Sequence, residues 1–163
     1  ENVAEIISGQ SPPGESYNEN GEGLPFFQGK AEFGDISPVA VKWCTAPKKI
    51  AESGDILMSV RAPVGPTNIA EEKCCIGRGL AAIRPDRKKI DRDFLIHFFK
   101  KIEKKIAQSG QGSTFQAINR NDLLALEIPA IHISEQKRIV DILNRAEGII
   151  RLRREQAAPA TGL

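Results

Sequence analysis

The sequence predicts an α+β fold, in which a compact mixed domain of short strands and one amphipathic helix precedes a long C-terminal helix of the coiled-coil type. Two observations support this class. Short apolar runs separated by glycine and proline fill residues 1–85, as in strands and turns. From Asp91 onward apolar residues recur every three or four positions, which is the period of an α-helix. Mixed short strands followed by two helices favour α+β.

The predicted strands are apolar or β-branched runs bounded by turn residues. Gly54-Asp55 forms a turn before the apolar run 56–61, which we expect to be a buried strand. Residues 74–85 are interpreted as one bulged strand, because two interior glycines permit a close backbone approach. We further expect a strand or helix end at 3–7, strands at 24–29, 39–44 and 123–128, a helical turn at 48–51, and loops at 8–23 and 111–116.

The first helix begins near Asp91 or Asp93, either of which is a suitable N-cap, and ends before Gly110. Lysines lie opposite its apolar face, as expected of a helix packed against a domain. The apolar positions are Phe94, Leu95, Phe98, Ile102 and Ile106.

The second helix is expected over 134–157, with Ser134 as its N-cap. Its apolar residues recur at spacings of four and three, which is a heptad seam that requires another helix as a partner. We therefore divide the chain into a domain at 1–133, this helix, and a disordered or foreign tail at 158–163. The interface residues are Ile139, Ile142, Leu143, Ala146, Ile149 and Ile150.

Charge is unevenly distributed along the chain. Residues 1–29 contain five glutamates and no lysine or arginine, whereas residues 84–105 contain nine basic and four acidic side chains. This asymmetry is typical of a protein with one basic face for a polyanion, although a solvated helix surface would give the same pattern. No apolar run approaches the roughly 20 residues of a membrane span, so no membrane partner is expected.

The three cysteines, Cys44, Cys74 and Cys75, have neither a disulfide pattern nor the spacing of zinc ligands. We expect reduced thiols, a cytoplasmic location and no metal. The sequence also lacks the glycine-rich phosphate loops, the GxSxG elbow and the HExxH motif. His97 and His132 have no nucleophile at a suitable spacing, so no catalytic residue is expected.

Binding signals are stronger, because polar loops follow several of the predicted elements. Amide, hydroxyl and basic side chains of this kind contact base edges and phosphates. The candidate DNA-binding residues are Gln10, Gln28, Lys30, Lys42, Arg61, Arg78, Gln111, Ser113, Thr114 and Gln116.

Four segments, in order, resemble the specificity (S) subunits of type I restriction–modification systems. Two short stretches depart from the usual pattern of that family: Ser11-Pro12, where Thr-Pro is more frequent, and Ala130–Ile133, where a second proline is usual. The four segments are Ile7–Pro12, Gly54–Gly65, Gly112–Ile118, and Ile128-Pro129 with Glu135–Val140.

The resemblance implies a non-catalytic subunit that reads one half of a bipartite DNA target. S subunits carry two target-recognition domains and two long helices that pack as a spacer, so this chain resembles one domain with the start of one spacer helix. The implied partners are double-stranded DNA, methyltransferase (M) subunits that bind S-adenosylmethionine, and restriction (R) subunits. No cofactor is expected on this chain itself.

Two alternatives remain open. A protein–protein adaptor would use the heptad helix as a scaffold without binding DNA, and salt-dependent binding to duplex DNA would argue against it. A recognition domain of a single-chain DNA methyltransferase would require a catalytic Asn/Asp-Pro-Pro-aromatic segment, which these 163 residues do not contain.

Overall fold

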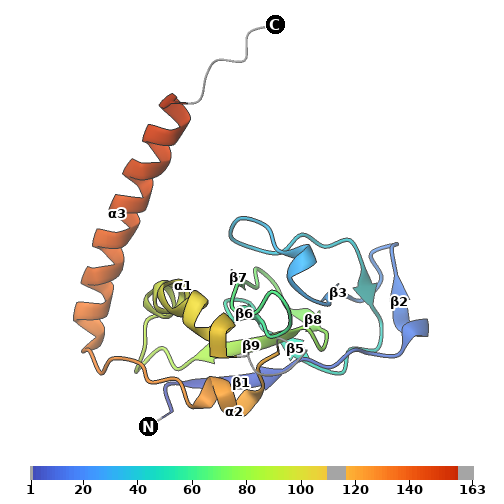
Figure 1. The fold of residues 1–163 in the computed structure, drawn as a ribbon. Helices are drawn as coiled ribbons and strands as arrows, with labels where there is room; N and C mark the ends of the chain where they lie inside the picture. Colours follow the sequence, from blue (N-terminus) through green and yellow to red (C-terminus); the bar gives the residue numbers. More distant parts are fainter. Residues whose placement is uncertain (1, 110–116, 158–163) are drawn as a thin grey trace, which may run out of the picture.

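The computed structural model describes residues 2–109 and 117–157, which form three layers (Figure 1). Helices α1 (Arg92–Ser109) and α2 (Arg120–Leu124) cover one face of a four-stranded sheet, and five short strands form a second sheet against its other face. Helix α3 (Ile133–Ala157) extends away from these layers. The predicted α+β class is confirmed.

Both sheets are built from strands distant in the sequence. In the described residues the first sheet is antiparallel throughout, whereas the second contains one parallel pair, β3 with β8. The first sheet has the order β1 (Ala4–Ser8), β9 (Leu80–Pro85), β6 (Ile56–Ser59), β7 (Thr67–Ile69). The second has the order β2 (Tyr17–Asn18), β4 (Trp43–Cys44), β3 (Leu24–Phe27), β8 (Cys74–Ile76), β5 (Ile50–Ala51).

The central strands β6 and β9 are buried on both faces, which explains the apolar runs from Ile56 to Met58 and from Leu80 to Ile83. Ile56 and Met58 of β6 and Ile83 of β9 pack towards the helices. Leu57 and Ala82, which alternate with them, pack towards the second sheet. Because successive side chains of a strand point to opposite faces, a strand between two layers requires apolar residues at every position.

Helix α1 begins as predicted. The Asp91 Oδ1 atom accepts hydrogen bonds from the backbone N–H groups of Asp93 and Phe94 at 2.9 and 3.0 Å. This N-cap satisfies two donors that have no partner within the helix. Phe94, Leu95 and Phe99 are buried against the first sheet, so the amphipathic face lies in the main core.

The predicted single strand at 74–85 is wrong, because the structure contains two strands in different sheets. Strand β8 ends at Ile76 and β9 begins at Leu80. Between them the chain forms a turn whose Gly77 and Gly79 N–H groups donate to the carbonyl oxygens of Phe27 and Gln28 at 2.8 and 3.1 Å. The glycines therefore mark the crossing from one sheet to the other, not a bulge within one strand.

The predicted strand at 123–128 is also wrong, because helix α2 occupies the start of this segment. The Asn119 side chain accepts from the N–H groups of Asn121 and Asp122, and the Asp122 side chain accepts from the N–H of Asn119. This reciprocal arrangement is a capping box, which stabilises the first helical turn.

Three smaller predictions need correction. The expected helical turn at 48–51 ends in strand β5, and only Trp43–Cys44 of the expected strand at 39–44 pairs in a sheet. Helix α3 begins at Ile133, one residue before the predicted N-cap Ser134, whose Oγ lies 2.8 Å from the His132 Nδ1. Strands were confirmed at β1 and β3.

Helix α3 is attached to the domain through its first turns. Gln136 is buried, and its Oε1 accepts from the N–H of Asp91 at 2.8 Å while its Nε2 donates to the carbonyl oxygen of Ile131 at 2.7 Å. Val140, one turn later, is buried in the main core. From Asp141 onward the described side chains are exposed, apart from the half-buried Gly148 position.

Candidate nucleic-acid interface

A hollow of about 400 Å³ opens where three strands of the first sheet end. Ser8 terminates β1, Ser59 terminates β6 and Leu80 begins β9, and the antiparallel pairings place these ends side by side. Segments adjacent to these ends, together with the start of α2, form the walls. The lining residues used below are Ser8, Gly9, Val60, Arg61, Arg78 and Arg120.

Backbone hydrogen bonds fix the walls of this hollow. The Val60 N–H donates to the Gly79 carbonyl oxygen at 2.9 Å, and the Ile118 N–H donates to the Val60 carbonyl oxygen at 3.0 Å. Arg61 and Ala117 pair in an isolated β-bridge. The segment before α2 is therefore attached to the end of β6, although these two regions lie far apart in the sequence.

The turn that carries Arg78 lies tightly against β3. A Cβ atom on Gly79 would fall against the carbonyl oxygen of Gln28, and one on Gly77 would fall against the Gln28 side chain. Glycine at both positions therefore permits the close approach. The Ser11 Oγ donates to the Gln28 Oε1 at 3.1 Å, which holds the amide against this turn.

Three arginines, Arg61, Arg78 and Arg120, line the hollow, and none of its lining residues is acidic. All three side chains are exposed, and none of them forms an ion pair with another described residue. The carboxylate of Asp122, two residues beyond Arg120, accepts a hydrogen bond from the Asn119 N–H at 2.7 Å. The hollow therefore has the charge expected of an anion-binding surface.

Of the sequence-predicted residues, the structure brings Arg61 and Arg78 together in this hollow. Gln10 is exposed and directly follows Gly9 of the hollow, whereas Gln28 is half-buried behind the Arg78 turn. Lys30 and Lys42 are exposed but do not line the hollow. Gln111, Ser113, Thr114 and Gln116 lie outside the described residues.

Arg120 lines the same hollow but was not among the predicted contacts. The sequence offered a reason to include Arg120, because it is a basic residue in a polar turn, as are Arg61 and Arg78. The prediction missed it because 119–122 was interpreted as a turn leading to a strand, which gave no reason to place it beside β6 and β9.

The predicted interface residues of α3 lie largely on its exposed side. Ile142 and Ile149 are 56% and 55% exposed, and Leu143, Ala146 and Ile150 are also exposed. Ile139, in contrast, is half-buried against the main core of the domain.

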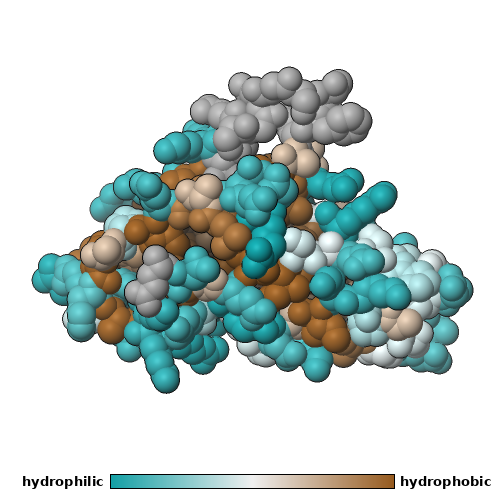
Figure 2. All heavy atoms as spheres, turned by 90° about the horizontal axis from the view of Figure 1, so that it is seen from below, coloured by the Kyte–Doolittle hydropathy of each residue, from teal (hydrophilic) through white to brown (hydrophobic). Residues whose placement is uncertain are grey.

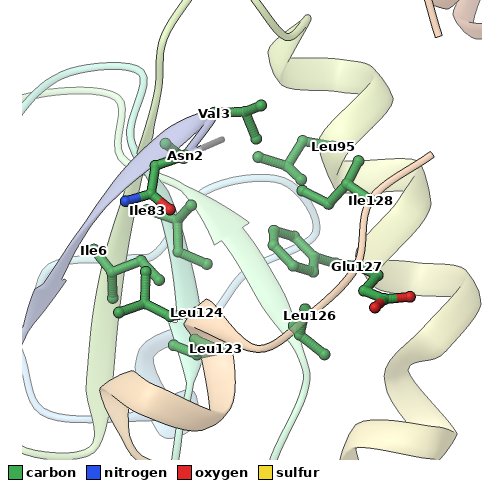
Figure 3. A pocket seen from close by; sticks show the side chains of 12 residues that line it. Asn2, Val3, Ile6, Ile83, Leu95, Leu123, Leu124, Leu126, Glu127 and Ile128 are labelled. Atoms are coloured by element: carbon green, nitrogen blue, oxygen red, sulfur yellow. The ribbon is translucent and has the colours of Figure 1, made fainter. Parts of the chain in front are cut away.

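A second hollow, of about 470 Å³, is lined mostly by aliphatic and aromatic residues and suits DNA poorly. It lies between β1, α1 and the segment after α2, where Val3, Leu95, Leu126 and Ile128 converge (Figure 3). On the face that carries β1 and α2, apolar atoms show at the surface between polar ones (Figure 2). Among the described residues that line this second hollow, the charged one is Glu127, which would repel phosphate.

The described residues contain neither a candidate metal site nor a helix that could span a membrane. Within residues 2–109 and 117–157, no group of three His, Cys, Asp or Glu side chains could hold a metal ion. Nor does any helix of those ranges combine the length and apolar character needed to cross a bilayer.

Comparison with known proteins identifies the family. Residues 1–158 match the family model described as the type I restriction modification DNA specificity domain. The chain belongs to this family. The resemblance inferred from the four sequence segments is therefore confirmed over residues 1–158, which we call the specificity domain.

Two curated relatives come from Methanocaldococcus jannaschii. The specificity domain is 46% identical over 156 residues to the putative type I restriction enzyme MjaX specificity subunit, covering 96% of this chain and 37% of that protein. It is 28% identical over 124 residues to the type I restriction enzyme MjaIX specificity subunit, covering 75% of this chain and 28% of that protein. This chain therefore spans little more than a third of the length of the MjaX subunit.

Two solved structures also resemble this chain. The HsdS subunit from Thermoanaerobacter tengcongensis is 47% identical, with a TM-score of 0.85 over 96% of this chain and 38% of that chain. A chain from a structural study of complex assembly and conformational transition of the type I R-M system is 49% identical, with a TM-score of 0.86 over 95% of this chain and 39% of that one. The specificity domain thus has a fold seen in larger subunits.

Proposed function

We propose that this chain is a DNA-recognition part of a type I restriction–modification specificity subunit. It reads one half of a bipartite target and is not itself catalytic. The observation that carries the proposal is the match of residues 1–158 to the DNA specificity domain family. The 46% identity to the MjaX specificity subunit supports the same role.

The hollow between β1, β6, β9 and α2 supports contact with DNA. It carries three arginines and no carboxylate among its lining residues. Basic side chains that face a polyanion supply most of the affinity of DNA-binding proteins and make that affinity depend on salt. A protein–protein adaptor has no need for such an uncompensated basic surface.

Helix α3 serves as the spacer in this proposal. Its 25 residues would extend about 37 Å, which is roughly one turn of B-DNA. The exposed apolar residues Ile142, Leu143, Ile149 and Ile150 require a partner helix, from a second recognition domain or a second copy of the chain. The length of the paired helices would then set the distance between two DNA half-sites.

The remaining partners are methyltransferase and restriction subunits, which supply the chemistry. S-adenosylmethionine would be bound by the methyltransferase subunit, and this chain would bind no cofactor. The assembly would act on double-stranded DNA in the cytoplasm. One related structure, described as concerning complex assembly of the type I R-M system, supports a role within such an assembly.

The proposal is tested by assembling the full-length protein with its methyltransferase subunits. The assembly is incubated with a plasmid library and S-adenosylmethionine, and methylated positions are mapped by sequencing. We expect methylation within one bipartite sequence, and none when the specificity subunit is omitted. Methylation without sequence preference, or methylation that persists without the subunit, would contradict the proposed function.

A further inference from the structure

Arg61, Arg78 and Arg120 lie far apart in the sequence but line one hollow of about 400 Å³. We propose that this hollow binds one phosphate group of the DNA backbone, with Arg120 as the third of its ligands. This inference rests on the proposed function. It adds to that function the chemical group that is bound and the residues that bind it.

The fold brings the backbone positions of the three arginines together before DNA arrives. Arg61 follows β6, Arg78 precedes β9, and a hydrogen bond from the Val60 N–H to the Gly79 carbonyl oxygen links the residues next to them. The Arg120 Nε donates to the Ile6 carbonyl oxygen of β1 at 3.3 Å. A site formed in advance loses less conformational entropy on binding than one assembled by the ligand.

The charge of the hollow favours an anion. Its described lining residues include no aspartate or glutamate, and the apolar residues Val60, Leu80 and Ala81 form part of its walls. An apolar wall reduces solvent screening, so a bound anion would interact more strongly with the guanidinium groups there than in open water. Without a counter-ion, three neighbouring positive charges would repel one another.

A phosphate fits this arrangement better than a base does. A guanine edge offers two neutral acceptors, O6 and N7, which one arginine fills. A backbone phosphate offers two non-bridging oxygens that share one negative charge and have several lone pairs, and planar guanidinium groups bind them through paired hydrogen bonds. Three arginines around one hollow therefore match a phosphate, whereas two of them would lack an acceptor on a base.

The assignment gives these residues a particular role. Phosphate contacts fix the position of a protein on the duplex and carry no sequence information directly. Arg61, Arg78 and Arg120 would thus set the register of the domain on DNA. Sequence would be read by other side chains near this hollow, such as Gln10, which follows Gly9.

The first test measures duplex binding by the full-length protein assembled with its methyltransferase subunits, over a range of salt concentrations. Arg120→Ala should weaken binding roughly tenfold on target and non-target duplexes alike, and should reduce the salt slope by about one. Arg120→Lys keeps the charge and should retain part of the affinity. Arg87→Ala is the matched control, because Arg87 is exposed at the other end of β9, outside the hollow.

The second test neutralises single phosphates with methylphosphonate linkages placed along the half-site. One linkage should weaken binding of the wild-type assembly but have no further effect on the Arg61→Ala, Arg78→Ala, Arg120→Ala triple variant. Equal losses for both proteins at every linkage would overturn the proposal. So would wild-type affinity in Arg120→Ala, or a loss confined to the target sequence.

The two proposals fail in distinguishable ways. If wild type binds and methylates its target but the three arginines prove dispensable, the phosphate site is refuted and the proposed function stands. If the wild-type assembly does not bind its target duplex, both are refuted.

Discussion

At the scale of single residues, Asp55 shows how the Gly54-Asp55 turn acts within the fold. Its carboxylate is 3% exposed and accepts two hydrogen bonds from Arg84, at 3.0 and 2.8 Å. It also accepts from the Glu52 N–H at 2.9 Å. The hydrogen bond to Asp55 raises the pKa of Arg84 above its ordinary value, although burial opposes this shift. The Gly54-Asp55 turn therefore stabilises the domain.

Asp55→Ala should lower the free energy of unfolding by about 2–3 kcal/mol. It leaves the Glu52 N–H and the Arg84 guanidinium without their acceptor, and removing one partner of a buried pair is costly. Urea unfolding followed by circular dichroism measures this change. Glu5→Ala is the control, since Glu5 pairs with the same arginine but is exposed, and it should cost less than about 0.5 kcal/mol.

The adjacent thiols of Cys74 and Cys75 predict a pH dependence of stability. Burial raises the pKa of each to about 12, from an ordinary value of 9.0. Between about pH 9 and pH 12 the unfolded chain therefore loses two protons that the folded chain retains. The unfolded state binds fewer protons there, so the free energy of unfolding falls as the pH rises through this window.

Urea unfolding at several pH values between 7 and 11 checks the effect, with a Cys74→Ala, Cys75→Ala variant as comparison. The variant is expected to be less stable at every pH because it contains cavities, but to lose less of its stability above about pH 9. If the free energy of unfolding fell equally with pH in both proteins, the thiols would not contribute to the pH dependence.

At the scale of the elements, Gln136 joins α3 to the domain. Besides its bonds to Asp91 and Ile131, its Nε2 donates to the Lys89 carbonyl oxygen at 3.3 Å. One buried amide thus connects α3, the turn before α1 and the segment before α3 itself. The direction in which α3 leaves the domain depends on this connection, and the proposed spacer role requires a defined direction.

Gln136→Ala should lower the free energy of unfolding by about 2–3 kcal/mol, because it leaves buried backbone groups without hydrogen-bond partners. It should also increase amide hydrogen exchange in the first turns of α3. Lys137→Ala, at the neighbouring exposed position, should change neither quantity. A Gln136→Ala variant with an unchanged free energy of unfolding and unchanged hydrogen exchange in α3 would contradict this role.

The two long helices could be predicted from the sequence because their signal is local. In α1 the apolar period and the Asp91 cap coincide within a few residues. The division of 74–85 into two strands could not be predicted, since it depends on the parallel pairing of β8 with β3, about fifty residues earlier in the chain. A run of apolar residues does not indicate which sheet each half of the run will join.

The candidate site, too, could be predicted only in part from the sequence. Polar loops indicated Arg61 and Arg78 as DNA contacts, but not that they line one hollow. Their proximity follows from the antiparallel pairing of β6 with β9, and Arg120 joins them through packing of α2 on β1. Long-range pairing of this kind has no signature in the sequence near any of the three arginines.

At the scale of the whole molecule, α3 presents two different faces. Gln136, Val140, Asn144 and Glu147 follow one side, where the Asn144 Oδ1 lies 2.9 Å from the His97 Nε2 and Glu147 lies 3.7 Å from the Lys100 Nζ. At about 100° per residue, the exposed apolar residues from Ile142 to Ile150 lie roughly a third of a turn away. The helix can therefore contact its own domain and a second helix simultaneously.

This arrangement predicts self-association of the isolated chain through the exposed stripe. Ile142→Glu with Ile149→Glu should abolish it without loss of stability, since both side chains are more than half exposed in the single chain. Light scattering at increasing concentration measures the effect, with Arg151→Glu, on the other side of α3, as control. A wild-type chain that stays monomeric at high concentration would contradict the prediction.

In the proposed function, residues 1–132 read one half of a DNA target. A domain transplant tests this role: the segment replaces one recognition domain of a type I specificity subunit of known target, and the methylation of the resulting assembly is mapped. We expect one half of the methylated sequence to change while the other half and the distance between them are retained. An unchanged target in an active assembly would contradict it.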